Sequence, residues 1–108
     1  MITTHVLDTS RGVAAAGLHV VLDVRHGAGW TSLGRRTTDG QGRVASFSDA
    51  ALAAGTYRLT FDTGAYHRGL GVTPFFPEVA VTFDVQSGAH YHVPLLLSPY
   101  GYTTYRGV

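Results

Sequence analysis

The stretch that decides the fold is residues 79–85, Val-Ala-Val-Thr-Phe-Asp-Val, in which large apolar side chains alternate with small or polar ones. A period of two is that of a β-strand with one face in a core and the other face outside it. The stretches 18–25 and 56–62 alternate in the same way. The pattern therefore predicts an all-β domain whose strands each turn one side toward a shared core.

Shorter strands are expected on either side of these three. Fourteen glycines and four prolines separate short segments rich in Val, Thr, Tyr and Phe, which is typical of all-β domains. A tight turn is expected at 39–42, and one or two helical turns are expected at 63–69. The remaining strands are predicted at 2–8, 30–37, 43–47, 90–97 and, as an edge strand, 101–106.

Two of the predicted strands carry apolar residues on both faces. In 2–8 and 90–97, the side that bears His5 and His92 also bears Leu7 and Leu96. A strand with two apolar faces is covered on both, and a small sandwich has only one interior. This second face is therefore expected to lie between subunits. Because Pro94 cannot donate a ladder hydrogen bond, it should mark a gap, a bulge or an edge.

Length and composition exclude several classes of protein. The 108 residues fit one domain, 1–108, which is too small to enclose a substrate cavity as well as a core. A net charge of +1 with scattered arginines gives no electrostatic footprint for nucleic acid. Without cysteine there is no disulfide, thiolate nucleophile or Cys-bound metal. No apolar run reaches about 18 residues and no signal peptide is visible, so a cytoplasmic protein with no membrane contact is expected.

The six histidines are the candidates for chemistry. Two lie two residues apart on one strand face, at His90 and His92, and His5 lies on the doubly covered face of 2–8. The other three occupy solvent-type or loop positions and are expected to take no part: His19, His26 and His67.

Three interpretations of these histidines stay open on the residues alone. His-x-His with a distant third histidine matches the ligand set of a catalytic zinc, although the motif is short and no carboxylate follows at a useful spacing. Alternatively, two imidazoles in one pocket can exchange protons with a substrate, with Arg43 binding negative charge. The third interpretation is structural, with His5 and His92 satisfied at an interface and Arg43 solvated.

The motifs resemble those of the transthyretin-related 5-hydroxyisourate hydrolases along essentially the whole chain. The opening Thr4-His5-Val6-Leu7-Asp8-Thr9-Ser10-Arg11-Gly12 and the ending, which runs from His90-Tyr91-His92-Val93-Pro94 to Tyr105-Arg106-Gly107, carry the resemblance. Thr38-Asp39-Gly40 with Gly42-Arg43, and Pro74-Phe75-Phe76-Pro77-Glu78, are similar to internal landmarks of the family in the right order.

The resemblance implies a transthyretin-like sandwich of two four-stranded sheets with one short helix, assembled as a homotetramer around a central channel. It implies hydrolysis of 5-hydroxyisourate, a product of urate oxidation, to 2-oxo-4-hydroxy-4-carboxy-5-ureidoimidazoline, with no metal or other cofactor. The matching catalytic positions are His5, Arg43, His92 and Thr103, with Tyr105 joining Arg43 and the histidines in substrate binding.

Two departures from the family pattern concern hydroxyl groups. Thr103 stands where serine is common, which keeps the hydroxyl but adds a methyl group, and Val108 replaces a frequent terminal serine. The rival function is that of a non-catalytic, transthyretin-like carrier of small ligands. The hormone carrier lacks the histidines and the Tyr-Arg-Gly ending that this chain keeps, so the resemblance favours the enzyme.

Overall fold

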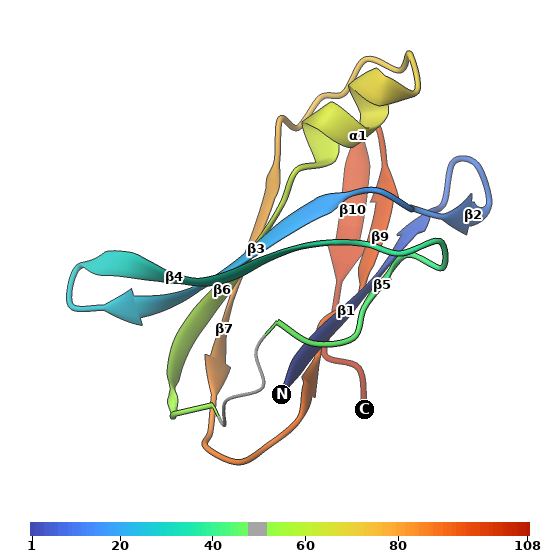
Figure 1. The fold of residues 1–108 in the computed structure, drawn as a ribbon. Helices are drawn as coiled ribbons and strands as arrows, with labels where there is room; N and C mark the ends of the chain where they lie inside the picture. The colour runs from blue at the N-terminus through green and yellow to red at the C-terminus, as the bar shows by residue number, and fades with distance from the viewer. Residues whose placement is uncertain (48–51) are drawn as a thin grey trace.

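The computed structural model describes residues 1–47 and 52–108, which form two β-sheets and a short helix (Figure 1). The elements in chain order are β1 (Ile2–Asp8), β2 (Val13–Ala14), β3 (His19–His26), β4 (Gly29–Thr37), β5 (Arg43–Val44), β6 (Gly55–Phe61), α1 (Thr63–Gly69), β7 (Val79–Val85), β8 (Tyr91–His92), β9 (Leu95–Ser98) and β10 (Gly101–Thr104).

One sheet is regular and antiparallel. Its strand order is β4-β3-β6-β7, and we call it the regular sheet. The pairing of β6 with β7 runs without interruption from Gly55–Val85 to Phe61–Val79. Its strands are those for which alternation of side chains gave the clearest prediction, because a period of two maps directly onto the two faces of a strand.

The other sheet is built around β1, and we call it the β1 sheet. Its path is β10-β9-β1-β2, and the two-residue strands β5 and β8 also pair with β1. β1 runs parallel to β8 and β9 and antiparallel to β5. The prediction of one strand at 90–97 is therefore wrong: there are two strands, and the interruption at Val93 and Pro94 lies where the proline was expected to mark a gap, a bulge or an edge.

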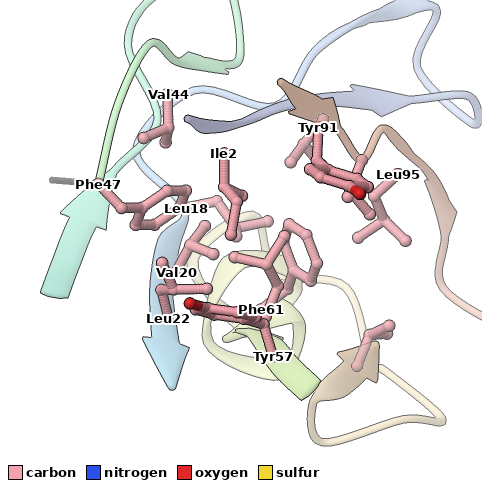
Figure 2. Packing of buried hydrophobic residues seen from close by; sticks show 14 of the residues in the cluster. Ile2, Leu18, Val20, Leu22, Val44, Phe47, Tyr57, Phe61, Tyr91 and Leu95 are labelled. Atoms are coloured by element: carbon pink, nitrogen blue, oxygen red, sulfur yellow. The ribbon is translucent and has the colours of Figure 1, made fainter. Parts of the chain in front are cut away.

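Apolar side chains from both sheets meet in one core (Figure 2). From the β1 sheet, Val6 and Leu95 are fully buried, and from the regular sheet, Leu59 and Phe61 are too. Each such side chain contributes roughly 1.5–3 kcal/mol through removal from water. On β1 the residues that alternate with the core positions, among them Thr3, His5 and Leu7, are only half-buried and lie on the sheet's outer face. The core therefore fixes which side of β1 carries polar chemistry.

α1 caps the end of the sandwich opposite the N-terminus (Figure 1). The Tyr66 hydroxyl donates to Asp8 Oδ2 at 2.8 Å, which ties the helix to the end of β1. The prediction that His67 occupies a solvent or loop position is wrong: the side chain is 2% exposed and lies on the inner face of α1. A helix of only seven residues is too short for a helical period to show in sequence.

Two further strands are shorter than predicted. The strand expected at 43–47 ends at Val44, and the one expected at 101–106 ends at Thr104. In the second case the chain leaves the ladder as the Arg106 guanidinium stacks over the Tyr91 ring, 4.6 Å from its centroid. The short strand β2 was not predicted, since two residues carry no periodicity.

Candidate active site

His5 and Arg43 face each other across β1 and β5. They are direct cross-strand partners, so their side chains lie on the same side of the β1 sheet. Thr3 and His92 are partners in the same way across β1 and β8. Because Thr3 and His5 are two residues apart on one strand, all four side chains share the outer face. Residues far apart in sequence are thereby gathered by the register of β1.

A tight turn sets the position of Arg43. Asp39 Oδ1 accepts hydrogen bonds from the amides of Gln41 and Arg43, at 2.8 and 3.0 Å. These two bonds, Arg43 first, hold the pKa of Asp39 below its usual value. Gly42 has a φ of 76°, and a Cβ there would lie 2.3 Å from the Val6 carbonyl oxygen. Only glycine allows β1 and the turn to approach this closely.

The turn also fixes the ring of His5. Its Nε2 lies 2.8 Å from the Gln41 carbonyl oxygen. A carbonyl only accepts, so Nε2 carries the hydrogen and donates, and Nδ1 is the nitrogen left for proton transfer. The half-buried His5 is thus oriented by backbone rather than by another side chain.

His92 is held by its strand partner Thr3. Its Nδ1 shares a 2.8 Å hydrogen bond with Thr3 Oγ1, and the same hydroxyl lies 3.4 Å from His90 Nε2. Burial lowers the pKa of His92, and the positive charges of Arg43, His5 and His90 lower it further, against a weaker opposing hydrogen bond to the Thr3 backbone. The pKa of His92 therefore lies below that of a free imidazole, which favours its neutral form.

Thr3, Arg43 and His92 line an open hollow of about 460 Å³, and His5 lies beside it without lining it. Its walls include Thr3, Asp39, Arg43, His90 and His92. Among the described residues the one ion pair joins Arg58 to Asp23 in the regular sheet, away from this hollow.

The other two predicted site residues lie elsewhere in the chain. Thr103 pairs with Leu96, which in turn pairs with Leu7, so it shares the outer face but lies two strands from β1, roughly 10 Å away. Tyr105 is exposed and borders a different hollow, of about 430 Å³, between β7 and the C-terminal segment. One chain thus brings together His5, Arg43 and His92 but adds neither Thr103 nor Tyr105 to them.

Sequence reasoning missed Thr3, Asp39 and the Gln41 carbonyl. Thr3 could have been found from the sequence, because residues two apart on a strand lie on the same face and Thr3 is two residues before His5. The hydrogen bonds made by Asp39 and by the Gln41 carbonyl depend on the backbone geometry of the turn. Within residues 1–47 and 52–108 no three histidine, aspartate or glutamate side chains come together as ligands for a metal ion. No helix in the same ranges is long and apolar enough to cross a membrane.

Comparison with known proteins finds similarity along nearly the whole chain. Residues 2–107 match the model of the HIUase/Transthyretin family. The 5-hydroxyisourate hydrolase of Salmonella dublin is 45% identical over 109 residues, covering 99% of this chain and 80% of the relative.

Two solved structures share the fold almost completely. The Klebsiella pneumoniae 5-hydroxyisourate hydrolase superposes with a TM-score of 0.90 at 39% identity, covering 99% of this chain and 98% of that one. Sea bream transthyretin, in complex with thyroxine, gives 0.93 at 33% identity, covering 99% and 94%. The chain belongs to the HIUase/transthyretin family.

Proposed function

We propose that this protein hydrolyses 5-hydroxyisourate, as a step in urate breakdown. The observation that carries the proposal is the cluster of His5, Arg43 and His92 on the outer face of the β1 sheet. The backbone does not separate enzyme from carrier, because the hydrolase and the thyroxine complex superpose about equally well. The side chains on this face are what favour the enzyme.

The proposed reaction is addition of water to a ring carbonyl followed by cleavage of the adjacent C–N bond. His92, whose pKa is lowered, takes a proton from the water as its oxygen bonds to the carbonyl carbon. His92 then returns this proton to the nitrogen that leaves as the C–N bond breaks, while His5, whose Nε2–H is held by the Gln41 carbonyl, accepts a hydrogen bond from the water through Nδ1. Arg43 binds the substrate and stabilises the negative charge that develops on the carbonyl oxygen. No metal or other cofactor takes part in this scheme.

We also propose that the protein works as a homotetramer whose central channel is formed by the outer faces of the β1 sheets. Leu7, Leu96 and Thr103 form one row across this face, and Leu7 and Leu96 are half-buried even in a single chain. A second subunit on this face would supply the hydroxyl that one chain does not bring near His92. A monomeric mass by light scattering at micromolar concentration would contradict this assembly.

A spectroscopic assay with freshly generated 5-hydroxyisourate tests the activity. The purified protein is expected to accelerate decay of the substrate well beyond the spontaneous rate, with and without a metal chelator. Decay at the spontaneous rate would rule out the hydrolase. Activity that chelation abolishes and zinc restores would favour the metal interpretation of His90 and His92.

A further inference from the structure

The ring of His92 is held on both sides of its attachment point. On one side, Thr3 Oγ1 lies 2.8 Å from Nδ1. On the other, a Cβ added at Gly107 would lie 2.6 Å from Cδ2 and 3.2 Å from Cγ, so the glycine backbone lies directly against this edge. Nδ1 and Cδ2 are the two ring atoms bonded to Cγ. With both flanks occupied, the Cε1–Nε2 edge is the one left for a reactant.

Backbone pairing holds both flanking residues in place. The Val93 amide donates to the Thr3 carbonyl at 3.0 Å, and the Gly107 amide donates to the His92 carbonyl at 2.8 Å. Gly107 and His92 form an antiparallel bridge, whereas Thr3 and His92 are partners in the parallel pair. The ends of the chain thus reach His92 from opposite sides.

The hydroxyl of Thr3 also bears on which nitrogen of the His92 ring carries the hydrogen. It lies 2.8 Å from His92 Nδ1 and 3.4 Å from His90 Nε2, and it has a single hydrogen. If the His92 Nδ1–H donates to Oγ1, the Thr3 hydroxyl is free to donate to His90 Nε2. That arrangement leaves the lone pair of His92 on Nε2, the unblocked edge of the ring.

We propose that Thr3 and Gly107 form a two-sided clamp that fixes His92 with its hydrogen on Nδ1 and Nε2 as the nitrogen that accepts the proton. Thr3 is the positioning residue, since it acts through His92, and Gly107 is the stop that only a residue without a side chain can provide. The clamp rests on the proposed hydrolase function for its purpose but not for its geometry.

The first test compares Thr3→Val with Thr3→Ser in the full-length protein. Valine keeps the shape of threonine and loses the hydroxyl, whereas serine retains the hydroxyl. Thr3→Val is expected to lower kcat roughly tenfold or more with little change in KM, the size seen when an imidazole loses the partner that orients it. Thr3→Ser should recover most of the rate. An equal kcat for the valine and wild-type proteins would overturn the clamp.

The second test does not depend on activity. Nitrogen-15 NMR of the His92 ring, at about pH 8 where an imidazole is neutral, reports which nitrogen carries the hydrogen. The wild-type protein is expected to show Nδ1–H, and Thr3→Val should move the population toward Nε2–H. A wild-type ring with its hydrogen on Nε2 would overturn the inference even in a fully active enzyme. Conversely, an inactive protein with the Nδ1–H ring would refute the hydrolase and leave the clamp standing.

Gly107→Ala tests the other flank. The added methyl group should displace the ring and lower kcat at least as much as Thr3→Val does. The wild-type far-ultraviolet circular dichroism should be retained, because Gly107 lies outside the named strands. Wild-type kcat in a folded Gly107→Ala protein would show that the glycine does not position His92.

Discussion

The two sheets of this sandwich differ in regularity: one has long, continuously paired strands, and the other, which carries the candidate site, has several short ones. In the regular sheet, four strands of seven to nine residues pair antiparallel, with one register shift between β3 and β4. In the β1 sheet, β2, β5 and β8 have two residues each, and β1 changes partners along its length. His5, Arg43 and His92 all lie in strands of this interrupted sheet.

The interruptions are what place the site. β5 and β8 each bring one functional side chain opposite β1, Arg43 beside His5 and His92 beside Thr3, and each then leaves the ladder. If β5 extended toward the N-terminus it would run into the Asp39 turn, and if β8 extended toward the C-terminus it would run into the interruption at Pro94. We therefore expect the regular sheet to govern stability and the β1 sheet to govern catalysis.

The largest effect is expected from a cavity in the regular sheet. Leu59 is fully buried in β6, so Leu59→Ala should lower the free energy of unfolding by about 2–5 kcal/mol. Urea unfolding measures this loss, and the kcat of the folded fraction should stay close to wild type. Thr60→Ala, its half-buried neighbour, is the control and should change stability by about 0.5 kcal/mol or less. A large loss of kcat in folded Leu59→Ala would break the separation between the sheets.

The reverse pattern is expected for Arg43→Lys in the β1 sheet. Lysine keeps the charge but loses the planar fork that binds two oxygens at once, so kcat/KM should fall by roughly 10–100-fold. Thermal unfolding should hardly change, because Arg43 is exposed. Arg35→Lys on β4 is the matched control, and both its activity and its melting temperature should be those of the wild type. Unchanged kcat/KM in Arg43→Lys would remove the guanidinium from the site.

A smaller, opposite effect is expected at His67 in α1. Within the described part of the chain, His67 Nε2 and Thr63 Oγ1 are buried without a hydrogen-bond partner. An unsatisfied buried polar atom costs about 1–3 kcal/mol, so His67→Leu should raise the free energy of unfolding by about 1 kcal/mol. Denaturant unfolding measures the gain, and kcat should not change. Destabilisation would mean that His67 makes a bond important for the helix.

The smallest effect concerns the pH dependence of kcat/KM. Because burial and three positive neighbours lower the pKa of His92 from 6.5, activity should fall on the acid side with a midpoint below pH 6.5. His90→Asn removes one of those neighbours, which favours the imidazolium. The midpoint should therefore move toward higher pH. A midpoint above 6.5 in the wild-type protein would exclude His92 as the base.

Alternation of side chains was sufficient to predict the regular sheet and β1. β1 and β7 have the predicted bounds, β3 and β6 are displaced by one residue, and β4 begins one residue earlier than predicted. These strands were predictable because a strand with one buried face has apolar residues at every second position. The break at Pro94 was predictable for a different local reason, the missing amide. The transthyretin-like fold implied by the motifs is confirmed by the solved structures.

The parts that could not be predicted depend on contacts between distant residues. Nothing in the sequence near Thr3 states that His92 is its partner, 89 residues away. The tautomer of His5 depends on a carbonyl in a turn, and the burial of His67 depends on how a two-turn helix docks. His90 and His92 were expected on one side of the chain, and both do reach the same Thr3 hydroxyl.

We propose that His92 alone, rather than the pair His90 and His92, carries proton transfer in this site. It is tested most directly by comparing kcat for His92→Asn and His90→Asn in proteins shown to be folded and equally assembled. Loss of a general base predicts a fall of roughly 100-fold or more for His92→Asn, and His90→Asn should lose less than about tenfold. If the two substitutions inactivate the enzyme to the same degree, the assignment of His92 as the catalytic histidine is wrong.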